Sequence, residues 1–158
     1  MFRELLRKKQ QLPEEDCINL LMRETRGVLS VLGDDAYPYG MPMNHYYCAE
    51  DGRIYFHCGK TGHRLDALRR HDKASFCVYD HGTCEEGEWA LQVKSVIVFG
   101  RITVIDDMAQ IIAISTALSR KFTRDEAYIQ REIEQYAAKT VLLCLTPEHI
   151  CGKSVTEA

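Results

Sequence analysis

Six runs of apolar residues, several of them alternating with polar residues, have the length and residue content of β-strands. A Glu-Asp-Gly turn at 50–52 joins the second run to the third and predicts a hairpin. Thr146 and Pro147 follow the last run, which predicts that this strand ends there. The predicted strands cover residues 28–32, 41–48, 53–58, 73–80, 91–105 and 140–145.

Four other segments carry apolar residues at helical spacing. Pro13 and the three acidic residues after it begin the first helix, because proline and negative charge both suit the first turn. A short basic helix follows the loop 59–62. Asp106 and Asp107 can cap the third helix, and the Thr-Arg-Asp-Glu run at 123–126 predicts a capping box for the fourth.

The order of these elements favours an antiparallel β-barrel with helices packed outside it. The strands follow one another through turns, while the helices are grouped, so the regular alternation of a doubly wound parallel sheet is missing. With 158 residues and 18.1 kDa, the chain has the size of one domain. We therefore expect a single domain over 1–158, with an N-terminal helical segment at 1–25 and a helical pair at 106–138.

Composition narrows the classes of partner. The net charge of −3 argues against a protein that binds nucleic acid through phosphate contacts. No apolar stretch is long enough to span a bilayer, and the N-terminus lacks the apolar core of a secretion signal, so we expect a cytoplasmic protein with no membrane partner. Seven cysteines form no disulfide framework in such a chain; most are expected to be small buried apolar residues.

The sequence Gly-Lys-Thr-Gly-His-Arg at 59–64 is the first candidate for chemistry. A glycine-rich loop between a strand and a helix can direct backbone N–H groups at an anion, and Lys60, His63 and Arg64 add charge and donors. The spacing is neither that of a Walker A loop nor that of a Rossmann fingerprint. The motif therefore predicts a phosphate site, and an ordinary solvated loop before a helix is the alternative.

Other catalytic constellations are weaker. His57 and Cys58 are adjacent on a strand, so their side chains point to opposite faces, and the chain has no metal-ligand spacing. We expect no metal. A Cys–His nucleophilic pair stays open, although no cysteine is singled out.

The segment 37–47 combines tyrosine, methionine, proline and asparagine within a strand pattern. Pro42 implies an edge strand or a bulge, where backbone groups are free for a ligand. Aromatic rings beside an amide suit a planar heterocycle. A hairpin with an aromatic core face is the alternative.

Taken in order, these segments resemble the FMN-binding split β-barrel superfamily of pyridoxamine 5′-phosphate oxidase-like proteins. Within it they are most similar to the 5-nitroimidazole resistance (Nim-type) branch. The resemblance covers nearly the whole chain. It is carried by residues 33–44, 52–57, 62–68, 95–101 and 149–153.

This resemblance implies a mainly β (α+β) fold: a six-stranded-type antiparallel split β-barrel with Greek-key character, flanked by helices. It also implies a homodimer with FMN at the subunit interface. One group of residues would lie beside the isoalloxazine ring: Met41, Pro42, Met43 and Asn44. A second group would approach the ribityl phosphate: Phe56, His57, Lys60, His63 and Arg64. Ser95 would meet the cofactor from the start of the long strand.

The implied activity is that of an FMN-dependent oxidoreductase that reduces nitroimidazole-like or other small electron-poor acceptors, with NAD(P)H as the expected reductant. His63 would be the catalytic residue, either as a phosphate contact, which we favour, or as a proton donor to substrate. Oxidation of pyridoxamine phosphate itself is disfavoured, because 62–64 replaces the Ser-Arg-Lys run of authentic oxidases and Trp89 is the only tryptophan. A flavin-binding module without turnover and a haem-binding relative with a histidine ligand are the alternatives.

Overall fold

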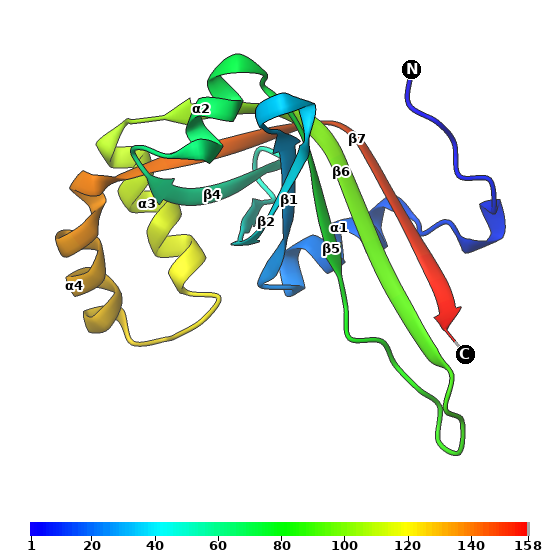
Figure 1. The fold of residues 1–158 in the computed structure, drawn as a ribbon. Helices are drawn as coiled ribbons and strands as arrows, with labels where there is room; N and C mark the ends of the chain where they lie inside the picture. The colour runs from blue at the N-terminus through cyan, green and yellow to red at the C-terminus, as the bar shows by residue number, and fades with distance from the viewer. Residues whose placement is uncertain (158) are drawn as a thin grey trace.

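Seven antiparallel strands form one sheet that curls around an apolar interior, and four α-helices flank it (Figure 1). The computed structural model describes residues 1–157. Neighbouring strands follow the order β2-β1-β5-β6-β7-β4-β3. The strands are β1 (Arg26–Leu32), β2 (Pro38–Asn44), β3 (Tyr46–Cys48), β4 (Arg53–Gly59), β5 (Lys73–Tyr79), β6 (Leu91–Ile105) and β7 (Thr140–Glu157). The helices are α1 (Glu14–Arg23), α2 (His63–Arg70), α3 (Met108–Ser119) and α4 (Glu126–Tyr136), with short 3-10 turns η1 (Lys8–Gln10), η2 (Asp34–Ala36) and η3 (Ala137–Lys139).

This architecture confirms the predicted mainly β split barrel with helices outside. The strands number seven rather than six because the predicted strand 41–48 is divided at His45. The backbone N–H of His45 donates to the carbonyl oxygen of Thr25, and the imidazole Nε2 of His45 lies 2.7 Å from the carbonyl oxygen of Leu21. These contacts hold a corner in the chain. Since β2 and β3 lie at opposite ends of the strand order, His45 is a one-residue link between the two edges of the sheet.

The prediction that Thr146 and Pro147 stop the last strand after Leu145 was wrong, because β7 continues through both residues to Glu157. The register of β6 and β7 shifts between Phe99 and Gly100, and Gly100 faces Pro147. A side chain at Gly100 would collide with the backbone of Thr146. The irregularity therefore admits a proline within a long strand, which is a common use of a bulge.

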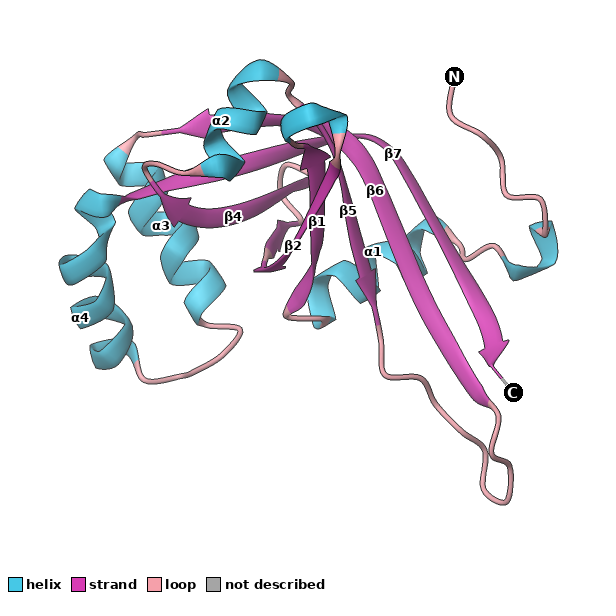
Figure 2. Cartoon of the chain, viewed as in Figure 1, coloured by secondary structure: helices cyan, strands magenta, loops and turns pink. Residues whose placement is uncertain are grey.

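Two apolar clusters lie on opposite faces of β7. The larger cluster fills the barrel interior and takes Leu143 and Leu145 from this strand. The smaller cluster takes Leu142 and Cys144, and Ile111 of α3 packs onto it. Alternate side chains of one strand thus serve two cores, because successive residues of a strand point to opposite faces. Figure 2 shows α3 and α4 beside the part of the sheet where β7 begins, which is where this second core lies.

The helix ends match the sequence in part. Asp107 caps α3 as predicted, since its carboxylate accepts a hydrogen bond of 2.9 Å from the N–H of Gln110. The predicted capping box at 123–126 was wrong: Asp125 caps α4 by accepting from the N–H of Tyr128, while the Thr123 hydroxyl accepts from the N–H of Asp125. Within residues 1–157, no helix is long and apolar enough to cross a membrane.

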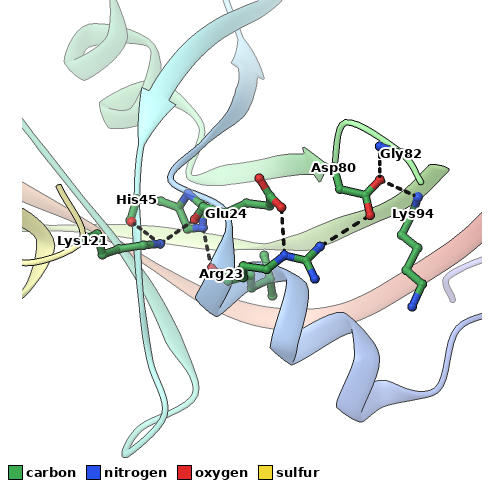
Figure 3. Close-up of polar contacts among 8 residues, drawn as sticks. Arg23, Glu24, His45, Asp80, Gly82, Lys94 and Lys121 are labelled. Atoms are coloured by element: carbon green, nitrogen blue, oxygen red, sulfur yellow. Dashed lines mark hydrogen bonds and ion pairs between the residues drawn. The ribbon is translucent and has the colours of Figure 1, made fainter. Parts of the chain in front are cut away.

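A polar group lies between the end of α1, the β2–β3 corner and the α3–α4 loop (Figure 3). The Nζ of Lys121 donates to the carbonyl oxygens of Glu24 and His45, at 2.6 and 3.1 Å. Burial lowers the pKa of Lys121 to about 8. Burial, with the Lys121 charge as a smaller cause, lowers the pKa of His45 to about 4. We call these residues, with Leu21, the His45–Lys121 cluster; it joins three segments that are distant in the sequence.

Candidate functional site

The loop between β4 and α2 lines an open pocket of about 290 Å³. β4 ends at Gly59 and α2 begins at His63, so the predicted loop between a strand and a short helix is confirmed. Gly62 has a φ of +121°, a conformation that residues with a side chain rarely adopt. Tyr39 of β2 and Cys58 of β4 complete the wall. We call this cavity the loop pocket.

Donors converge on the loop pocket from both backbone and side chains. The N–H groups of His63 and Arg64 belong to the first turn of α2 and have no acceptor among residues 1–157. The Arg64 side chain lines the pocket. The Lys60 ammonium lies 3.1 Å from the carboxylate of Asp106, and both side chains are largely exposed. Free N–H groups at a helix start beside two cationic side chains have the chemistry of an anion site.

The His63 side chain is held from two directions at the pocket rim. Its ring stacks on Tyr39, with centroids 4.4 Å apart and planes inclined by 13°. Its Nε2 lies 3.5 Å from the carboxylate of Asp34, which also pairs with Arg70. One edge of the imidazole is thus beside a carboxylate, and one face is covered by an aromatic ring. This geometry orients His63 without burying it.

The four predicted ring contacts on β2 divide between the two faces of the strand. Met41 and Met43 are buried in the barrel core, at 4% and 6% exposure, while Pro42 is exposed and Asn44 is half-buried. The Arg64 Nε lies 3.0 Å from the Met41 sulfur, so α2 and β2 meet at the pocket. β2 pairs only with β1, which confirms that Pro42 lies on an edge strand.

The structure separates the two β4 residues that were predicted near the phosphate. Phe56 is fully buried in the barrel core. His57 lines a different cavity, next to α3 and α4, whereas its neighbour Cys58 lines the loop pocket. The alternation of side chains along a strand explains this separation.

Ser95 lies far along β6 from the loop pocket. It pairs with Tyr79 and Lys153, whereas the Lys60 partner Asp106 directly follows Ile105 at the other end of β6. Ten residues of strand separate Ser95 from Ile105, on the order of 30 Å. Within one chain, the structure does not bring Ser95 together with the loop residues.

Tyr39 and Cys58, which line the pocket, and Asp34, which contacts His63 at its rim, lie outside the set of cofactor contacts predicted from the sequence. Tyr39 and Asp34 belong to the segment 33–44 that carries the resemblance, and this was the sequence signal that could have placed them near the site. Cys58 follows from alternation once Phe56 is assigned to the core.

The cysteines show no feature of a nucleophilic site. Burial raises the pKa of Cys58, although the nearby Arg64 charge has the opposite effect. The raised pKa favours the protonated thiol, which is a poor nucleophile. The expectation that most cysteines are buried was wrong: Cys17 and Cys144 are buried, four others are half-buried, and Cys84 is exposed. Among residues 1–157, no three histidine, cysteine or acidic side chains are placed to hold a metal ion.

Solved structures with this fold share little of the sequence. A candidate 5-nitroimidazole antibiotic resistance protein from Bacteroides thetaiotaomicron is 15% identical, with a TM-score of 0.76 over 92% of this chain and 87% of its own. A flavocytochrome from Azotobacter vinelandii is 17% identical, with a TM-score of 0.77 over 98% of this chain and 73% of its own. An FAD binding protein from Mycobacterium smegmatis is 20% identical, with a TM-score of 0.63 over 92% and 98%. At such identities the likeness concerns the fold.

The sequence itself matches one family. Among proteins of curated function, none is significantly similar to the chain. The family description "Pyridoxamine 5'-phosphate oxidase" matches residues 13–154, which contain β1–β6, most of β7 and the whole loop pocket. The chain therefore belongs to the pyridoxamine 5′-phosphate oxidase family.

Proposed function

We propose that the protein is an FMN-dependent oxidoreductase and that the loop pocket holds the FMN phosphate. The observation that carries this proposal is the pair of free N–H groups at the start of α2, beside Arg64 and Lys60, in a chain of this family. A dianionic phosphate would accept from His63 and Arg64 and draw Lys60 away from Asp106. The pocket residues thus fit the group.

The flavin ring would lie along the outer edge of β2. Because β2 pairs on one side only, every second peptide group points away from the sheet and is free for a ligand. Pro42 has no N–H, which leaves an apolar patch on this edge, and the Asn44 amide accepts a 2.9 Å hydrogen bond from Arg26 at its end. Edge backbone and an amide would orient the ring by hydrogen bonds to its heteroatoms.

The open face of the sheet supports the proposed homodimer with FMN at the subunit interface. Several outward side chains of β1, β5 and β6 are apolar or uncharged and are half-buried already: Val28, Ser30, Cys77, Ser95, Ile97 and Phe99. Such a face can pack against a second copy of itself. A second subunit would also let Ser95 approach the cofactor held by its partner.

Bound FMN would supply the transfer of electrons from NAD(P)H to a small electron-poor acceptor, such as a nitroimidazole. The chain would supply binding and orientation. His63 has two possible tasks: a hydrogen bond to phosphate, or proton donation to the reduced acceptor. The position of His63 at the rim of the loop pocket, at the start of α2, supports the phosphate contact.

Spectroscopy of the purified protein tests this proposal. Absorbance near 450 nm, with FMN identified in the released cofactor and a dimeric mass, is expected. A Soret band would instead identify a haem-binding relative. Anaerobic mixing with NADPH or NADH should bleach the flavin, and added nitroimidazole should restore its colour while a reduced product appears. A bound flavin that neither nucleotide bleaches would identify a binding module without turnover.

A further inference from the structure

A second cleft, of about 310 Å³, lies between the helical pair and the sheet. α3, α4 and η3 form its walls, and β4 and β7 contribute one residue each. His57 faces this cleft, while the next residue, Cys58, faces the loop pocket. The two cavities are therefore on opposite faces of β4, and the proposed FMN site does not account for the second one.

Ser115 places an unsatisfied polar group in the cleft wall. Only 6% of this residue is exposed, and its hydroxyl has no hydrogen-bond partner among residues 1–157. A buried hydroxyl without a partner destabilises the fold, because it has lost its hydrogen bonds to water and gained none. A ligand group that forms a hydrogen bond with the Ser115 hydroxyl would remove this destabilisation. The wall of the cleft therefore offers a ligand a hydrogen bond that no other group within residues 1–157 uses.

The rest of the lining combines an apolar surface with one carboxylate. Ile129, Ile133 and Ala137 provide the apolar part. Glu132 lines the same cleft, is only half-buried, and forms no ion pair or hydrogen bond within residues 1–157. Desolvation lowers the pKa of His57, which favours its neutral form. Glu132 is the acidic side chain of the lining, and a carboxylate favours a cationic ligand.

The arrangement is a binding site rather than a hydrolytic centre. No hydrogen bond joins His57 to Ser115, Ser119 or Glu132 in the described chain, so no nucleophile is activated. The volume is at the lower end for ligand pockets, which suits a small molecule.

We propose that this cleft binds a small organic amine: its ammonium would pair with Glu132, its apolar body would lie on Ile129 and Ile133, and Ser115 would hydrogen-bond its polar end. The site is independent of the loop pocket. A protein that binds no flavin would still bind the amine, so the two proposals fail separately.

Amide-resolved NMR titration of the ¹⁵N-labelled full chain tests the site with three matched probes. Phenethylamine, 2-phenylethanol and 3-phenylpropionate share an aromatic body and differ in charge. Phenethylamine is expected to shift amides of α3 and α4 and to bind about fivefold more tightly than the alcohol, since an ion pair with a half-buried carboxylate contributes about that much. The carboxylate should bind most weakly.

Two variants and a control separate the site from adventitious binding. Glu132→Gln should make the amine and the alcohol bind equally, and Ser115→Ala should weaken amine binding several-fold while raising the melting temperature of the unliganded protein. Glu134→Gln removes a charge from the same helix outside the cleft and should change neither affinity. Equal binding of amine and alcohol by the unaltered chain, shifts confined to other regions, or equal effects of the two glutamate variants would overturn the proposal.

Discussion

Lys60 and Lys121 show two uses of the same side chain. Lys60 is exposed in the loop between β4 and α2 and pairs with a carboxylate that is itself exposed. Lys121 is half-buried and donates to two backbone carbonyl oxygens, which are fixed by the elements they end. An exposed ion pair contributes little to stability and can be exchanged for another anion. A buried ammonium with carbonyl partners is costly to remove, since it leaves both acceptors without a donor.

The largest expected effect comes from Lys121→Met. This substitution removes both hydrogen bonds of the ammonium and leaves the carbonyl oxygens of Glu24 and His45 without a donor, so unfolding free energy should fall by about 3–5 kcal/mol. Urea denaturation at pH 7.5 measures the loss. Lys139→Met is the control, because Lys139 is exposed and forms no ion pair within residues 1–157; it should change stability by less than about 0.5 kcal/mol. Equal losses of unfolding free energy in the two variants would contradict the stabilising role assigned to the Lys121 hydrogen bonds.

The second effect is a loss of stability in acid through His45. The unfolded chain binds a proton at this histidine near pH 6.5, whereas the folded chain binds it only near pH 4. Stability therefore falls as pH decreases from 6.5 to 4, by about 2.5 kcal/mol at pH 4.5. The pH dependence of urea unfolding should be smaller by this amount in His45→Gln than in the unaltered protein. Parallel curves for the two would contradict the assignment.

The third effect concerns ligand affinity with stability unchanged. Lys60→Ala combined with Arg64→Ala should weaken FMN binding by about 30-fold, because two charged contacts to phosphate are lost. Fluorescence titration of FMN, with riboflavin as the probe that lacks phosphate, measures the change. Riboflavin should bind the double variant and the unaltered protein equally. Unchanged FMN affinity would exclude the loop pocket as the phosphate site.

The smallest effect tests the partner of Lys60. Asp106→Asn frees the ammonium from its carboxylate, so FMN should bind about two- to fivefold more tightly at low salt. Added salt should reduce this gain, because exposed charges are screened. Asp125→Asn is the control, because asparagine also caps helices and Asp125 has no part in the pocket; this variant should leave FMN affinity unchanged. Weaker FMN binding by Asp106→Asn would contradict the proposed exchange.

Local patterns in the sequence predicted much of this fold. The apolar run 91–105 matches β6 at both ends, because its length and its flanking aspartates and polar loop leave few alternatives. The loop before α2 was predicted because two glycines precede a segment that has apolar residues at helical spacing and several basic residues. His45 was not recognisable as a break, since the corner depends on Leu21 and Thr25, which reach it only in the folded chain. β7 passes Pro147 because of Gly100 on another strand.

The candidate site was predictable to the same extent. A glycine-rich loop followed by a short helix was correctly predicted, and His63 and Arg64 at the start of that helix line the loop pocket. The stacking of Tyr39 on His63 and the carboxylate of Asp34 depend on how β2 and η2 approach α2. The spacing of apolar residues along the sequence does not predict how these elements pack against one another. The predicted contacts of Phe56, His57 and Ser95 with FMN stay predictions.

β7 also affects how the molecule opens. Its alternate side chains belong to the two cores, so the strand cannot leave the sheet unless both cores are lost together. α4 contributes only Ile129 and Ile133 to buried contacts near the sheet and can detach with less disruption. Amide hydrogens in the centre of β7 should thus exchange with solvent only on global unfolding, while those of α4 exchange through local opening. The long strand makes the barrel a cooperative unit, and the helical pair is a less stable subregion attached to it.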